Sequence, residues 1–254
     1  DPIAGSLQRI AGPSLTRTSV LSSGTWYRIA VIQNGVHKIS YQQLKDLGID
    51  VDNINPRNLR LYGNGGGSLP FANSSPRADD LLENSIKIVG ESDGVLNTAD
   101  YLLFYGSGQT KWILDESTGK FLHQINPYSD TTYYFITADL GPGKRIQTVN
   151  DNSPSLTVNS FDDRQVQEAD LVNLLKSGRE WYGESMDNIT STRNFNFSFP
   201  NILPADTTFI KMSLLGRSLS NSGANSNRFT ITIGSQASVI QPFTNVGSSP
   251  QDNY

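Results

Sequence analysis

The chain has 254 residues, with 20 basic against 24 acidic side chains and no cysteine. These residues therefore form no disulfide, no thiol nucleophile and no cysteine-ligated zinc or iron–sulfur site. The net charge of −4 argues against a nucleic-acid partner, which would need an excess of lysine and arginine. No apolar run approaches the roughly 20 residues that cross a bilayer, so we expect no transmembrane segment in this chain.

The composition favours strands and turns. Serine, threonine, asparagine and glycine are abundant and only 17% of the residues are charged, which suits solvated strand faces better than helical bundles. We predict a mainly β chain with one connecting helix and one short helix: a β-sandwich or β-barrel-like N-terminal domain, then the start of a second β-sandwich. The expected parts are an extended lead-in (1–25), a β-rich domain (26–157), a helical connector (158–185) and a second, incomplete β region (186–254).

The first elements are a strand, a turn and a short helix. Residues 26–32 are predicted to form a strand with a mostly buried face. Asn34-Gly35 is the strongest short hairpin signal, so residues 36–39 are expected to return as the partner strand. Ser40 is suited to cap a short helix that Gly48 ends. Further strands are predicted at 58–62, 84–89, 101–105, 112–114, 133–138 and 145–149. The strand at 101–105 is too apolar for a one-sided surface, so we expect it to be central in its sheet.

The pattern then changes after Thr157. A capping sequence at 160–163 precedes an apolar stripe of helical period that Gly178 ends, which predicts the connecting helix; the stripe is Val166, Ala169, Leu171, Val172, Leu174 and Leu175. Residues 194–199 alternate polar and aromatic, which predicts a strand, with further strands at 209–215 and 228–233.

One loop resembles part of a calcium-binding loop. Around Gly94, the oxygen ligands would be Glu91, Asp93, Asn97 and Asp100. The pattern departs at its first position, which is Val89, and at its closing position, which is Asp rather than Glu. The alternative is an acidic connection between two strands. Calcium is the one cofactor that the sequence suggests; otherwise we expect none.

Other motifs favour structural roles over catalysis. The glycine-rich loop at 63–68 lacks the lysine of a phosphate-binding loop and is interpreted as a turn. The two histidines, His37 and His123, lie near no nucleophile motif. An acidic cluster at 79–83 suggests a solvated surface rather than a glycosidase pair. We therefore expect no catalytic residue in this chain.

Several sequence blocks, taken in order, resemble the PorU-type sortases of the type IX secretion system, which are gingipain-like cysteine peptidases of Bacteroidetes. The resemblance extends over roughly residues 19–200. The blocks are SVLSSGTWYRIAV (19–31), NGVHKISY (34–41), PRNLRLYGNGGG (56–67), RADDLLEN (77–84), GESDG (90–94), DYLLFY (100–105), HQINPYSD (123–130), YYF (133–135) and NLLKSGREWYGE (173–184).

The resemblance implies a location and a set of partners. The full-length family removes C-terminal sorting domains from secreted cargo and attaches the cargo to anionic lipopolysaccharide, so the resemblance implies an exported protein at the cell surface, associated with the outer membrane. Its Cys/His pair lies in a downstream domain, and this chain has no cysteine to match. The implied fragment is a non-catalytic scaffold and interaction region. Its implied partners are the downstream peptidase domain and an outer-membrane barrel protein of the secretion system.

Arg179, Trp181 and Tyr182 are the predicted interaction residues, because arginine and tryptophan are favoured interface anchors. The alternative for Trp181 is packing of the connecting helix against the first sandwich. The rival function is a stand-alone carbohydrate-binding β-sandwich that uses Trp112, Trp181 and Tyr182. A hydrolase that uses paired carboxylates is a third alternative.

Overall fold

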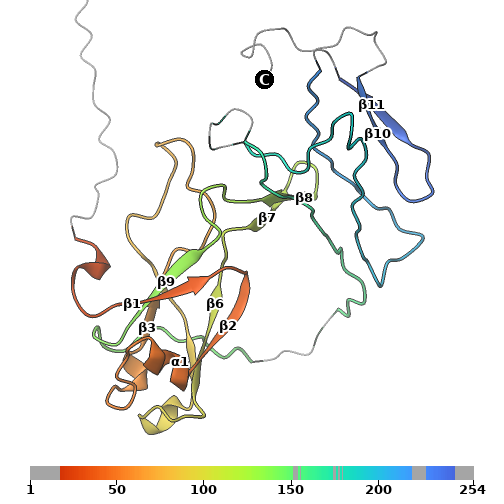
Figure 1. Cartoon of the computed structure of the whole chain (residues 1–254). Helices are drawn as coiled ribbons and strands as arrows, with labels where there is room; N and C mark the ends of the chain where they lie inside the picture. Colours follow the sequence, from red (N-terminus) through yellow and green to blue (C-terminus); the bar gives the residue numbers. More distant parts are fainter. Residues whose placement is uncertain are drawn as a thin grey trace, which may run out of the picture. The chain divides into compact units, whose positions relative to one another are not determined.

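The structure, a computed structural model, describes residues 18–150, 154, 156–173, 176, 178, 180–218 and 227–243 (Figure 1). The chain divides into two compact units, Asp1–Phe197 and Ser198–Tyr254. The prediction of a mainly β fold is confirmed, since the described residues hold eleven strands and one short α-helix.

The strands follow one another closely through the first unit. They are β1 (Tyr27–Val31), β2 (Gly35–Ser40), β3 (Arg60–Tyr62), β4 (Glu83–Asn84), β5 (Lys87–Val89), β6 (Tyr101–Gly106), β7 (Lys111–Asp115), β8 (Lys120–Gln124) and β9 (Thr132–Thr137). The α-helix is α1 (Tyr41–Asp46). Single 3-10 turns lie at Val20–Ser22, Pro56–Asn58 and Glu91–Asp93.

Two open antiparallel sheets make a sandwich-like domain. One sheet has the strand order β1-β9-β3-β4 and the other has the order β2-β6-β5, so β6 is central, as its apolar sequence predicted. Both sheets and α1 contribute to a single buried cluster. Its members include Val31, Leu61, Tyr134 and Ile136 from the first sheet, Ile39, Ile88, Leu102 and Phe104 from the second, and Leu44 from α1.

The predicted hairpin at Asn34-Gly35 does not form. β1 pairs with β9 and β2 pairs with β6, so the chain crosses from one sheet to the other at this point. The Asn34 side chain accepts a hydrogen bond from the Gly108 N–H and donates one to the Thr110 carbonyl, both at 2.9 Å. Contacts with the connection between β6 and β7 therefore override the local turn preference.

The short helix forms as predicted. Ser40 and Gln43 make a reciprocal capping box at the start of α1. Gly48 follows the helix with φ +96°, a left-handed conformation that favours glycine. The helix buries Leu44 in the shared core, and this contact fixes its position at the end of β2.

The predicted connecting helix is wrong over the residues that the structure describes. Residues 156–173 contain no helix, and Val172 instead forms an isolated antiparallel bridge with Tyr182. Most of this stretch is exposed. A helix gains most of its stability by burying its apolar face, and this segment has no buried apolar face. Leu174 and Leu175 of the expected stripe lie outside the described residues.

The second unit contains one described hairpin, β10 (Arg228–Ile231) and β11 (Val239–Pro242), which pair antiparallel. The strand predicted at 228–233 is thus confirmed in its first part. The strands predicted at 194–199 and 209–215 are wrong, because those residues form no strand.

Candidate interaction surface

The two histidines are held by ordinary structural contacts. The His37 ring stacks on Phe104 with centroids 5.3 Å apart, and its Nε2 lies 3.0 Å from the Gln33 carbonyl oxygen. His123 Nδ1 lies 2.7 Å from a carboxylate oxygen of Glu168. Neither arrangement includes a nucleophile. The absence of catalytic residues stays a prediction, which a peptidase assay of the chain tests.

The residues of the suggested calcium loop are bound to other protein groups. Glu91 accepts two hydrogen bonds from the Nε of Arg145, at 2.9 and 3.2 Å. Asp100 accepts from the Asn97 N–H at 2.7 Å, and Asp93 accepts from the Val95 N–H at 3.2 Å. Among the described residues, no three acidic or histidine side chains gather in a metal-binding cluster. Calcium would have to displace Arg145 from Glu91, and calorimetric titration tests whether it does.

The glycine-rich loop allows a close approach of two backbones. A Cβ added at Gly66 would lie 2.1 Å from the carbonyl oxygen of Gly108, so only glycine fits there. The Gly67 N–H donates to the Gln109 side chain at 2.8 Å. These contacts pack the glycine-rich loop against the connection between β6 and β7.

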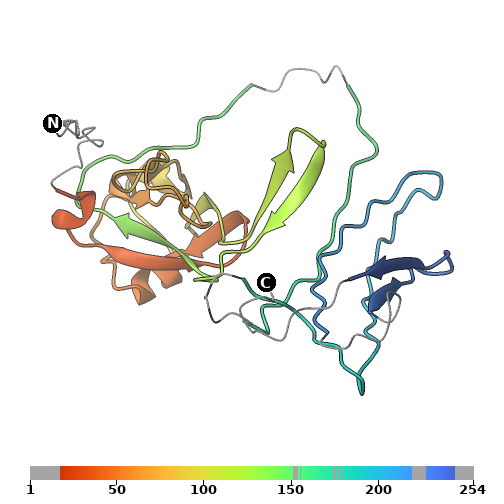
Figure 2. The ribbon, with the colours of Figure 1, turned by 90° about the horizontal axis from the view of Figure 1, so that it is seen from above.

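β7 and β8 form a hairpin that pairs with no other strand in the described part of the chain. It projects from the sandwich (Figure 2). Its large apolar side chains are 36–47% exposed: Trp112, Ile113, Leu114, Phe121 and Leu122. A two-stranded hairpin is marginally stable alone, and a contiguous exposed apolar surface often marks a binding site. The hairpin is therefore a candidate interaction surface.

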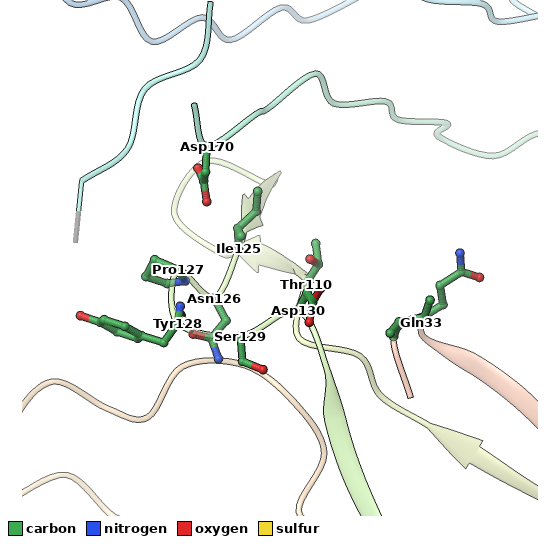
Figure 3. Close-up of a pocket in the computed structure, with 10 residues that line it drawn as sticks. Gln33, Thr110, Ile125, Asn126, Pro127, Tyr128, Ser129, Asp130 and Asp170 are labelled. Carbon is green, nitrogen blue, oxygen red and sulfur yellow. Dashed lines mark hydrogen bonds between the residues drawn. The ribbon is translucent and has the colours of Figure 1, made fainter. Parts of the chain in front are cut away.

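An open pocket of about 650 Å³ lies beside the base of this hairpin. It is lined mainly by the turn at residues 125–130, together with Gln33, Thr110 and Asp170 (Figure 3). Asn126 fixes the turn by accepting a hydrogen bond from the Tyr128 N–H at 3.1 Å. The Tyr128 ring extends away from the pocket and is largely exposed.

The predicted anchor residues are only partly described. Arg179 lies outside the described residues. Trp181 is 38% exposed, and the Tyr182 backbone exchanges hydrogen bonds with Val172 at 2.8 and 2.9 Å. Trp181 does not pack a connecting helix, because the described part of that segment is not helical. Its docking role, and the carbohydrate-binding alternative, stay predictions that partner-binding and glycan-array measurements test.

The sequence predicted β7 but not β8. It also did not predict the contacts between the hairpin and residues 164–168. The signal for β8 was available: Ser117-Thr118-Gly119 is a turn sequence, and Gly119 precedes the second strand. The contact of His123 with Glu168 was not predictable, because Glu168 lies 45 residues away in a segment without regular structure.

Comparison with solved structures shows a likeness over part of the chain. No family model matches the chain, and no curated protein matches it. The chain is similar to the crystal structure of dimeric latent PorU from Porphyromonas gingivalis, with a TM-score of 0.51 and 27% sequence identity. The match covers 65% of this chain and 14% of that chain. No helix in the described residues is long and apolar enough to cross a membrane. The chain has a PorU-like fold.

Proposed function

We propose that this chain is a non-catalytic scaffold and interaction region of a PorU-type sortase. The likeness to latent PorU carries the proposal: it combines a TM-score of 0.51 with 27% identity, and it covers 65% of this chain rather than one short motif. The chain spans only 14% of the length of that protein. The activity of the full-length family, which is removal of sorting domains and attachment of cargo to anionic lipopolysaccharide, thus belongs to the proposal.

The architecture supports a scaffold role. The sandwich has one continuous core, and its surface presents a projecting apolar hairpin. Rigid sheets that hold an exposed apolar element are suited to recognise another protein. In this proposal the chain is exported and works at the cell surface. Its partners are the downstream peptidase domain and an outer-membrane barrel protein of the secretion system.

The sequence encoded directly after Tyr254 tests the assignment. We expect a domain with a Cys/His pair in the same reading frame. A stop codon there, or a domain of another enzyme class, would contradict the proposal. This test requires no assumption about which surface of the chain binds a partner.

A binding measurement tests the interaction role. The tagged chain is incubated with detergent-solubilised outer membranes of the organism that encodes it, and the secretion-system barrel protein is quantified by mass spectrometry. We expect enrichment that falls when Ile113 and Leu122 are both changed to serine. The matched control changes Ile189 and Ile202 to serine, which removes exposed apolar side chains outside the hairpin. Equal recovery with both double variants would contradict a role for the hairpin.

A further inference from the structure

One face of the β7–β8 hairpin is defined by strand register. Trp112 lies opposite His123, and Leu114 lies opposite Phe121. Because side chains alternate along a strand, these four residues share one face, while Ile113 and Leu122 lie on the other. The Trp112 and His123 rings pack in an edge-to-face arrangement, with centroids 4.8 Å apart. This recognition face is therefore aromatic, with an imidazole at one end.

A second segment of the chain contacts this face. We call residues 161–170 the strap; it runs past the hairpin in Figure 2. The Arg164 guanidinium carbon lies 3.6 Å from the centroid of the Phe121 ring and 5.8 Å from that of Trp112. Four residues later, the Glu168 carboxylate lies 2.7 Å from His123 Nδ1. All these contacts fall on the recognition face.

The strap and the hairpin differ in regular structure and in side-chain exposure. The strap forms neither helix nor strand, and nearly all of its residues are exposed. At this contact, the His123 side chain is 12% exposed while that of Glu168 is 44% exposed. The imidazole is held by the paired strands of the hairpin, whereas the carboxylate stands on a segment without regular structure. A cation over an aromatic ring and one polar contact at the surface are individually weak, so another segment can replace them.

We propose that the recognition face binds an extended segment of a partner protein, and that the strap occupies it as a displaceable internal ligand. The partner segment presents an arginine to Phe121 and Trp112 and, four residues later, a carboxylate to His123. Chemical complementarity argues for this occupant, because the strap already places an arginine and a carboxylate on the face. The inference goes beyond the proposed sortase assignment and stands without it.

The test uses a fluorescent synthetic peptide of residues 159–172 and the full chain, with fluorescence anisotropy as the readout. The double variant Arg164→Ala/Glu168→Ala weakens the internal ligand. We expect it to bind the peptide at least about tenfold more tightly than the native chain, whose tethered strap competes at a high effective concentration. Equal affinity of the two chains, or no binding to the double variant at millimolar peptide, would overturn the proposal.

Two further variants locate the site. Phe121→Ser, added to the double variant, should abolish peptide binding, while Gln124→Ser on the opposite face should leave it unchanged. Circular dichroism and melting curves confirm that each variant is folded. Equal loss with both substitutions would overturn the assignment of the face. A native dimer that dissociates in the Arg164→Ala/Glu168→Ala variant would identify a second copy as the occupant, which also overturns the proposal.

Discussion

The stretch from β1 to β9 and the stretch after residue 155 contain similar alternating sequences, but they differ in burial. In the first stretch, alternate residues of paired strands enter one shared core. In the second, residues 194–199 alternate polar and aromatic as a strand would, yet Phe195 and Phe197 are 44% and 50% exposed and form no strand. Alternation therefore defines a strand only where a neighbouring strand accepts its hydrogen bonds and another layer covers its apolar face.

The largest expected effect is on the free energy of unfolding, and it comes from changing one phenylalanine to alanine in each stretch. Phe104 is 1% exposed in the central strand β6, whereas Phe197 is half exposed. Phe104→Ala should lower the free energy of unfolding by about 3–5 kcal/mol, because it leaves a cavity in the core. Phe197→Ala should change it by less than about 0.5 kcal/mol. Urea denaturation followed by circular dichroism measures both, and similar losses would mean that Phe197 is also part of a packed core.

Arg145 provides the next test, because one side chain ties together distant segments of the sandwich. Its guanidinium donates to Glu91 and to the carbonyls of Pro56, Arg57 and Leu59. Arg145→Ala should cost about 2 kcal/mol of unfolding free energy, because charged hydrogen bonds are lost at a partly buried site.

Arg193 is the matched control for Arg145. It lies in the second stretch and contacts only the Ser185 carbonyl among the hydrogen bonds described for it. Arg193→Ala should therefore cost less than about 0.5 kcal/mol. Arg145→Lys should recover little of the lost stability, because lysine lacks the planar fork of donors. Full rescue by lysine would show that charge alone, rather than the set of hydrogen bonds, is what matters.

The sequence predicted local elements better than it predicted their partners. The N-cap at Ser40 and the central position of β6 follow from local chemistry and from an apolar run, and both are confirmed. The hairpin at Asn34-Gly35 fails because Asn34 is bound to the β6–β7 connection, some 75 residues away in the chain. The connecting helix fails because an apolar stripe predicts a helix only if another surface buries it.

The candidate site was less predictable than the fold. Trp112 was identified as an exposed aromatic residue, but its recognition face also requires β8, Arg164 and Glu168. These groups meet only through tertiary structure, and no spacing in the sequence links Arg164 to Phe121. Arg179, which was predicted as an anchor, lies outside the described residues, so its role stays a prediction.

A smaller, pH-dependent effect is expected where the N-terminal turn joins the sandwich. Asp80 accepts hydrogen bonds from the Val20 N–H at 2.5 Å, the Leu81 N–H at 2.8 Å and the Ser19 hydroxyl at 2.9 Å. The hydrogen bond from the Val20 backbone, followed by that from Leu81, holds the pKa of Asp80 below its ordinary value. The folded carboxyl is therefore harder to protonate than the unfolded one.

The stabilising contribution of Asp80 is fully present above the ordinary carboxyl pKa and is lost as the pH falls through the lowered value. NMR titration of the Val20 amide should show release of the turn in that acidic range, with the core amides unchanged. Asp80→Asn should remove this pH dependence, because the carboxyl that titrates is gone. A Val20 signal that still titrates in Asp80→Asn would show that another group controls the turn.

The smallest expected effect concerns Trp181, which lies in the second stretch and is 38% exposed. If the residues after 155 lie outside a packed core, the Trp181 indole contributes little to stability, because it buries no connecting helix. Trp181→Ala should then change the free energy of unfolding by less than about 1 kcal/mol, measured by urea denaturation beside Phe104→Ala. A loss close to that of Phe104→Ala would place Trp181 in a packed core. A small loss that is accompanied by weaker binding of the barrel partner would instead support the docking role, because truncation of an interface tryptophan lowers affinity without unfolding the chain.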